Sequence, residues 1–166
     1  MIVAGNLRLR RLAMDDCRSL AALADNERVC RYLSQFPSPY TLADAEAWIR
    51  RTAAEEVPLN FGIEHERELA GVCGLEVSDP PEKAWLGYWL GERFWGRGLA
   101  TTVVGLMLAY ASGEMGLKYL EATVHPDNLA SRKVLAKNGF SVRSSRPGSQ
   151  PIEDRLIMSL ELVVRP

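Results

Sequence analysis

The sequence predicts a single α/β (α+β) domain over residues 1–166, with a mixed, mostly antiparallel sheet of six to seven strands and helices on both faces. Three observations lead to this fold class. The length of 166 residues and the apolar content of 47% suit one domain with a sizeable core. Three consecutive strand candidates joined by short turns indicate an antiparallel meander. A strand–helix–strand succession then predicts a parallel pair.

The first half of the chain predicts one strand, a helical region, a capped helix and then the meander. Alternating Leu and Arg in residues 7–12 indicate a strand with one solvated face. Residues 14–33 begin with acidic residues and carry leucines at helical spacing, which indicates one or two helices. Residues 41–56 follow as a helix, with Thr41 as its cap and Asp44 completing a capping box. The meander strands are predicted over 59–65, 68–78 and 83–91.

The second half predicts two helices that alternate with strands. One helix covers 99–115 and ends at Gly116, and another covers 127–139 with Asp127 or Asn128 as its cap. Because the first of these helices connects two strands, those strands are expected to be parallel neighbours in the sheet. The strands of this half are predicted over 117–125, 140–144 and 153–163.

Composition and charge exclude several classes of protein. The net charge of −1 lacks the basic excess of a dedicated nucleic-acid binder, so no nucleic-acid partner is expected. The three cysteines are odd in number and unclustered, which argues against a disulfide framework and against a metal site. The N-terminus does not resemble a signal peptide, and the apolar runs are too short to span a bilayer. We therefore expect a cytoplasmic protein with reduced thiols and no membrane association.

Two glycines lie immediately before the helix at 99–115. At a helix N-terminus the first backbone N–H groups lack partners and the helix dipole is positive, so anions bind there. Gly96 and Gly98 would let the backbone approach such a ligand, and Arg97 adds a positive charge. Thr101 and Thr102 would add hydroxyl donors. The segment is therefore compatible with a pyrophosphate cradle, whereas the glycine pair taken alone favours a tight strand-to-helix turn that needs glycine for its geometry.

The segments "WGRGLA" and "HPDNLASRKVLAKNGF" together resemble the GCN5-related N-acetyltransferase (GNAT) superfamily, and within it the branch that acetylates ribosomal-protein N-termini. The resemblance extends over nearly the whole chain. It implies a single-domain GNAT fold with a splayed pair of parallel central strands, acetyl-CoA as the cofactor, and transfer of acetyl to a primary amine. The family's acyl-CoA loop has the form Gln/Arg-x-x-Gly-x-Gly/Ala. Gly98 and Ala100 match this pattern, whereas Trp95 departs from it.

The resemblance also implies which residues bind the cofactor. Backbone amides of residues 97–102 would hold the pyrophosphate, and the pantetheine arm would run along residues 88–90. Asn128 would hydrogen-bond that arm, although it can equally be a simple helix cap. Arg132 could reach phosphates, although a residue in such a place more often belongs to a solvated face. The full predicted set is Tyr88, Trp89, Leu90, Trp95, Gly96, Arg97, Gly98, Leu99, Ala100, Thr101, Thr102, Asn128, Ser131 and Arg132.

For catalysis, the resemblance assigns the donor to the thioester carbonyl to the backbone N–H of Leu90. Many relatives use a tyrosine as the acid for the leaving thiolate, but Leu135 stands at that position, so Ser131 is the candidate acid. A glutamate that relatives often carry as a base is replaced by Leu86. Glu121 and His125 are the alternative bases, and a water chain without a dedicated side chain is the third possibility.

The sequence therefore predicts an acetyl-CoA-dependent N-acetyltransferase, a monomer or homodimer, whose acceptor is a protein or peptide N-terminal amine. One alternative acceptor is a small-molecule amine such as a polyamine or an aminoglycoside. A second alternative is a non-catalytic acyl-CoA-binding module, which the leucines at positions 86 and 135 favour.

Overall fold

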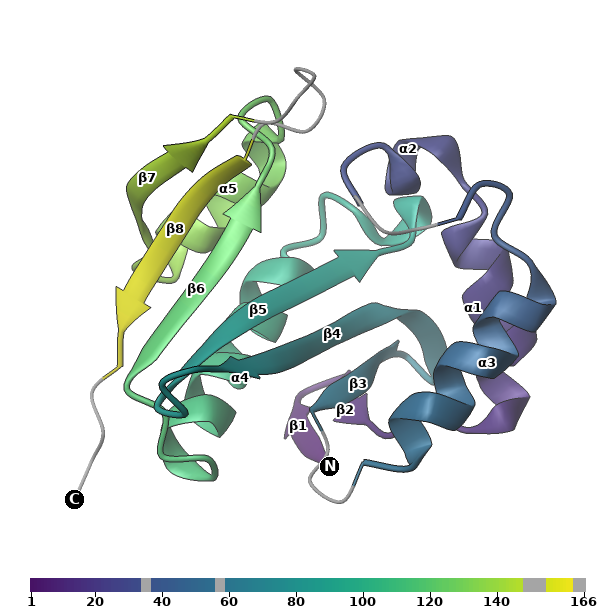
Figure 1. Ribbon diagram of the computed structural model, residues 1–166. Coiled ribbons are helices and arrows are strands. Elements are labelled where there is room, and N and C mark those ends of the chain that lie inside the picture. The colour runs from purple at the N-terminus through teal and green to yellow at the C-terminus, as the bar shows by residue number, and fades with distance from the viewer. Residues whose placement is uncertain (34–36, 56–58, 148–154, 163–166) are drawn as a thin grey trace. The chain divides into compact units, whose positions relative to one another are not determined.

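The computed structural model describes residues 1–33, 37–55, 59–147 and 155–162 (Figure 1). Its eight strands are hydrogen-bonded in the order β1-β2-β3-β4-β5-β6-β8-β7. β5 and β6 run parallel, whereas β1–β2, β2–β3, β3–β4, β6–β8 and β7–β8 are antiparallel. This confirms the mixed, mostly antiparallel sheet, with one strand more than expected. The chain divides into two compact units, Met1–Gly74 with Tyr88–Leu99, and Leu75–Gly87 with Ala100–Pro166.

The strands of the first unit include one that the sequence analysis did not anticipate. This strand, β1 (Ile2–Ala4), is only three residues long and pairs with β2 (Leu7–Arg10) through a turn at Gly5, where φ is +59°. In β2 the leucines are buried and Arg8 is exposed, as the alternation predicted. The unit also holds β3 (Asn60–His65), the first part of β4 (Glu68–Ser78) and the end of β5 (Lys83–Leu90).

The helical region at 14–33 is divided more finely than the sequence indicated. It forms a 3-10 turn, η1 (Met14–Asp16), followed by α1 (Cys17–Ala24) and α2 (Glu27–Cys30). The second α-helix begins where it does because the side-chain oxygen of Asn26 accepts hydrogen bonds from the amides of Arg28 and Val29.

The next helix, α3 (Leu42–Ala53), has the capping box that the sequence predicted. Asp44 N donates to Thr41 Oγ1 at 3.2 Å, and Thr41 N donates to Asp44 Oδ2 at 2.8 Å. Two amides that lack partners at the helix end are thereby satisfied, which fixes where α3 starts.

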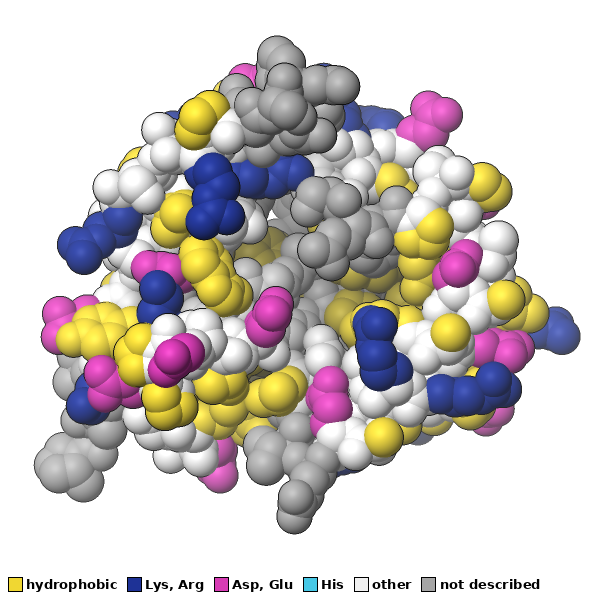
Figure 2. Space-filling model, viewed as in Figure 1, with side chains coloured by type: hydrophobic (Ala, Val, Ile, Leu, Met, Phe, Trp, Pro, Cys, Tyr) yellow, Lys and Arg dark blue, Asp and Glu magenta, His cyan; other side chains and the backbone are white. Residues whose placement is uncertain are grey.

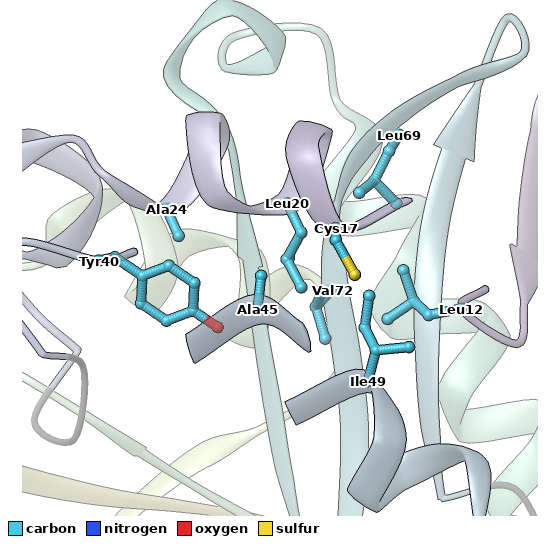
Figure 3. Close-up of a cluster of buried hydrophobic side chains, with 9 residues drawn as sticks. All are labelled: Leu12, Cys17, Leu20, Ala24, Tyr40, Ala45, Ile49, Leu69 and Val72. Carbon is cyan, nitrogen blue, oxygen red and sulfur yellow. The ribbon is translucent and has the colours of Figure 1, made fainter. Parts of the chain in front are cut away.

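The core of the first unit lies where α1 and α3 pack against β4 (Figure 3). Burying one large apolar side chain stabilises a fold by roughly 1.5–3 kcal/mol, so this cluster holds both helices to the strand. Its buried members are Leu12, Cys17, Leu20, Ala24, Tyr40, Ala45, Ile49, Leu69 and Val72.

The second unit is built around one long apolar helix and three further strands. α4 (Leu99–Gly113) buries Val103, Val104, Met107 and Ala111. α5 (Leu129–Lys137) begins at Asn128, so of the two possible caps it is Asn128 that caps the helix. The strands are β6 (Tyr119–Val124), β7 (Ser141–Arg146) and β8 (Arg155–Glu161). Of the predicted strand at 153–163, the residues 153, 154 and 163 lie outside the described part of the chain.

The parallel pairing of β5 and β6 is short. It joins Lys83, Ala84 and Trp85 to Tyr119, Leu120 and Glu121, and it ends there although both strands continue. The predicted parallel pair is therefore confirmed.

The surface and the cysteines agree with the composition. Basic and acidic side chains are interspersed over the face shown in Figure 2, as the net charge of −1 suggests.

Cys17, Cys30 and Cys73 are free thiols, and burial raises the pKa of Cys17 and of Cys73. In the described ranges, no helix is long and apolar enough to cross a membrane, and no cluster of three His, Cys, Asp or Glu side chains forms a metal site.

Candidate active site

The glycine-containing loop lies between the end of β5 and the start of α4. A short 3-10 turn, η2 (Glu92–Phe94), leads into residues 95–98, which are exposed. Gly96 and Gly98 have φ values of +75° and +76°, a region that residues with a Cβ rarely adopt. A Cβ built at either glycine would meet nothing within 4 Å. The glycines are therefore needed for backbone conformation, and the space beside them is open to a ligand.

The loop is attached to β5 by the side chain of Trp95. Its indole Nε1 donates a hydrogen bond of 2.7 Å to the carbonyl oxygen of Leu90. The guanidinium carbon of Arg28 lies 5.7 Å from the centroid of the Trp95 ring, which is a cation–π distance. Arg28 also donates to the carboxylate of Glu92, and Asn26 Nδ2 donates to that carboxylate at 3.0 Å. The start of α2 is therefore bound to the loop by three contacts.

The end of β5 approaches β4 unusually closely. A Cβ at Gly71 would lie 2.1 Å from the carbonyl oxygen of Trp89 and 2.8 Å from the Cα of Leu90, so only glycine fits there. Gly91 N donates to Ala70 O at 2.9 Å, and the Leu90 side chain is buried. The backbone around Leu90 is thus held on the β4 side as well as by Trp95.

The start of α5 brings together Asn128 and Ser131 in the second unit. Asn128 Oδ1 accepts a hydrogen bond of 3.1 Å from the backbone N–H of Ser131. The cap uses one acceptor of the Asn128 amide, which leaves its other polar groups for a ligand. Arg132 does not extend into solvent as a simple solvated side chain would, because its Nη1 donates to Pro126 O at 3.0 Å.

Both candidate bases have partners. Lys83 Nζ lies 2.6 Å from Glu121 Oε2, and the Glu121 side chain is mostly buried. His125 is buried, and its Nδ1 accepts a hydrogen bond of 3.1 Å from the backbone N–H of Asp127. In the neutral tautomer that this bond requires, the ring proton is on Nε2. His125 in that tautomer donates rather than accepts at its second nitrogen.

A pocket of about 370 Å³ opens in the first unit beside the end of β5. Its walls are largely aromatic and apolar, and one acidic and one basic side chain lie at its edge. Its lining includes Leu20, Tyr40, Asp44, Trp48, Arg51 and Trp89. Burial raises the pKa of the Tyr40 phenol, so it stays protonated. Hydrogen bonds from Thr41 lower the pKa of Asp44, so that carboxylate stays charged.

The predicted site residues thus fall into two groups that are described separately. Residues 88–99 lie in the first unit, where Leu90 and Trp95 are in direct contact. The residues from Ala100 onward, with Asn128 and Ser131, lie in the second unit. The sequence analysis missed the pocket and the contacts of Arg28. Trp48 lies on the apolar face of α3 and has the spacing of a core residue, so its pattern carries no separate signal for a pocket.

Comparisons with known proteins give a consistent result. A family model described as an acetyltransferase (GNAT) domain matches residues 6–141. The chain is 29% identical over 138 residues to the uncharacterized N-acetyltransferase YoaA of Bacillus subtilis (strain 168), a match that covers 80% of this chain and 77% of that protein. It is 27% identical over 141 residues to spermidine N(1)-acetyltransferase of Escherichia coli (strain K12), which covers 84% and 75% of the two chains.

Among solved structures, the fold is similar to that of RimL, a ribosomal L7/L12 alpha-N-protein acetyltransferase in complex with coenzyme A. The TM-score is 0.84 at 18% sequence identity, and the superposition covers 96% of each chain. At this level of identity, the likeness establishes the fold.

Proposed function

The chain belongs to the family of acetyltransferase (GNAT) domains and is an N-acetyltransferase, and on this premise we propose that it transfers acetyl from acetyl-CoA to the N-terminal amine of a protein or peptide. The observation that carries the cofactor assignment is the loop at Gly96 and Gly98. Its two positive φ values turn the backbone into the start of α4, where amides without helical partners and a positive dipole suit a pyrophosphate. RimL, which shares the fold, is described with coenzyme A bound.

The other predicted residues would contact successive parts of the acyl-CoA molecule. The amides of residues 97–102 bind the pyrophosphate, the edge of β5 at residues 88–90 pairs with the pantetheine arm, and Asn128 hydrogen-bonds that arm. This strand edge suits the role because the pairing of β5 with β6 ends at Trp85, before those residues begin. The Arg132 guanidinium donates to the carbonyl oxygen of Pro126, so a phosphate contact would use its remaining N–H groups.

The chemistry that we propose is direct attack of the amine on the thioester. A C–N bond forms, the C–S bond breaks, the amine loses a proton and the coenzyme A thiolate gains one. The Leu90 N–H would stabilise the oxyanion that develops on the carbonyl, and the Ser131 hydroxyl would protonate the thiolate. Because Glu121 and His125 both have partners, we propose that the amine loses its proton to water without a dedicated base.

The pocket beside Trp89 supports a peptide acceptor. Trp89 lies next to Leu90 in the chain, so the pocket adjoins the proposed position of the acetyl carbonyl. A polyamine carries several positive charges and would call for several carboxylates, whereas the pocket lining pairs the carboxylate of Asp44 with a residue of opposite charge, Arg51, in the same wall. The aromatic walls formed by Trp48 and Trp89 suit the apolar first side chain of a peptide.

The test incubates the protein with acetyl-CoA and each member of a set of acceptors. The reaction rate is followed by the release of free coenzyme A thiol, and the acetylated product is identified by mass spectrometry. The set contains peptides that differ in their first residue, spermidine and an aminoglycoside. A peptide with an apolar first residue is expected to have the highest kcat/KM. A higher kcat/KM for spermidine would overturn the peptide assignment. If the protein bound acetyl-CoA but released no coenzyme A thiol in the presence of any of the acceptors, the non-catalytic alternative would be supported.

A further inference from the structure

We propose that Trp95 is a positioning residue for acetyl transfer, acting through the carbonyl of Leu90 to fix the direction of the Leu90 N–H. The inference rests on the proposed function, which places the acetyl carbonyl at that N–H. It starts from the hydrogen bond of 2.7 Å between Trp95 Nε1 and Leu90 O. The Trp95 side chain is 41% exposed, so the ring contributes less to the apolar core than a buried tryptophan would.

The peptide group between Leu90 and Gly91 is held at both ends. Trp95 donates to its oxygen, and its N–H donates to Ala70 O at 2.9 Å. The preceding peptide group, which carries the Leu90 N–H, has its oxygen packed against Gly71 on β4. Because the Leu90 side chain is buried, rotation about its backbone bonds is restricted on every side.

An oxyanion donor must be accurately placed to be effective. A misplacement of about 1 Å in such a site costs on the order of 10²-fold in rate. Removing the indole donor would release one end of the peptide group between Leu90 and Gly91. The Leu90 N–H would then sample a wider range of directions. The transition state would therefore lose more hydrogen-bond stabilisation than the bound substrate does.

The position of Trp95 itself depends on the first unit's N-terminal helices. Arg28 stacks on the indole ring and is held by Glu92, which also accepts from Asn26. Arg28 therefore steadies the ring without donating to Leu90. It is a second variant position that leaves the indole N–H intact.

The test compares Trp95→Phe with the native enzyme in two measurements. The Phe ring keeps a surface for Arg28 but has no N–H. The first measurement is the separation of kcat from the dissociation constant for acetyl-CoA. The second is the infrared carbonyl band of bound acetyl-CoA labelled with ¹³C at the acetyl carbonyl, since a hydrogen bond from Leu90 lowers its frequency. Trp85→Phe, the same change at a tryptophan of β5 outside the loop, is the matched control.

The expected result for Trp95→Phe is a fall in kcat of about 10- to 10²-fold, a carbonyl band displaced toward that of free acetyl-CoA, and an almost unchanged dissociation constant. Arg28→Met should change kcat and the band in the same direction by a smaller factor. An unchanged kcat and band in Trp95→Phe would overturn the inference. So would a weakened dissociation constant with an unchanged band, because Trp95 would then only support the loop. A native enzyme without turnover or band displacement would instead contradict the proposed function.

Discussion

Lys83 Nζ lies 2.6 Å from Glu121 Oε2, and Glu121 belongs to the last residue pair of the parallel β5–β6 ladder. The lysine also lies 5.4 Å from the centroid of the Trp85 ring, which is a cation–π distance. The contact gives the Glu121 carboxylate a charged partner within the second unit.

The first prediction concerns the pH dependence of the rate. Glu121→Gln and His125→Ala should each keep the acidic limb of the profile of kcat/KM against pH, because the amine loses its proton to water. When acceptors of different basicity are compared, the pH midpoint of this limb should move with the pKa of the acceptor amine. Loss of the limb in either variant, with the fold retained, would identify that residue as the base.

The second prediction concerns the loop glycines. Gly98→Val should lower the affinity for acetyl-CoA by at least about tenfold, because a side chain would fill space beside the amides and strain a φ of +76°. The backbone strain should destabilise the fold by about 1–2 kcal/mol. Calorimetry with acetyl-CoA and thermal unfolding measure the two effects.

Gly113→Ala is the matched control, since a Cβ there also meets nothing within 4 Å and the residue ends α4. It should leave both affinity and stability nearly unchanged. If folded Gly98→Val bound acetyl-CoA as tightly as the native protein does, the assignment of this loop as the pyrophosphate cradle would be wrong.

The third prediction concerns the thiolate acid. Ser131→Ala should lower kcat by roughly 10²-fold with little change in acetyl-CoA affinity, because the hydroxyl acts mainly in the transition state. The cap of α5 should survive, since Asn128 Oδ1 accepts from the backbone of Ser131 and not from its side chain. Ser112→Ala, a helix serine in α4, is the control. Full activity of Ser131→Ala would refute the acid role.

The fourth prediction concerns acid stability. Burial opposes ionisation of Asp16, but hydrogen bonds from Arg10 and from the amide of Ala13 outweigh it and lower its pKa. The charged form is therefore favoured in the folded state, and its contribution is present above the unfolded pKa of about 3.9 and lost as pH falls below it. Asp16→Asn should cost about 1–3 kcal/mol at pH 7.

Urea unfolding at pH 7 and at pH 3 measures this effect. The difference between Asp16→Asn and the native protein should shrink at the lower pH, while Asp15→Asn, at the neighbouring exposed position, should change little at either pH. A difference that is independent of pH would contradict the assignment of the ion pair between Arg10 and Asp16.

Features that depend on neighbours within a few residues could be predicted from the sequence. The capping box of Thr41 and Asp44 formed as expected, because both of its hydrogen bonds close over three residues. The same holds for the alternation in β2. The cap of α5 was predicted only as Asp127 or Asn128, and the structure selects Asn128. The division of residues 14–33 was missed in detail because Asn26 can cap a helix or continue one, and its local sequence does not decide between them.

Contacts between distant residues were decided only by the tertiary structure. Asn26 and Glu92 are 66 positions apart, and Lys83 and Glu121 meet because β5 and β6 share a particular register. The pocket likewise takes Trp48 from α3 and Trp89 from β5, and each alone has the pattern of a core residue. The sequence by itself determined the family, through its motifs. It also determined the glycine loop and the cap at Thr41, since these depend on local backbone geometry. The partners of Trp95, Glu121 and His125 depend on strand pairing and helix packing, which bring groups together at distances that residue spacing does not encode.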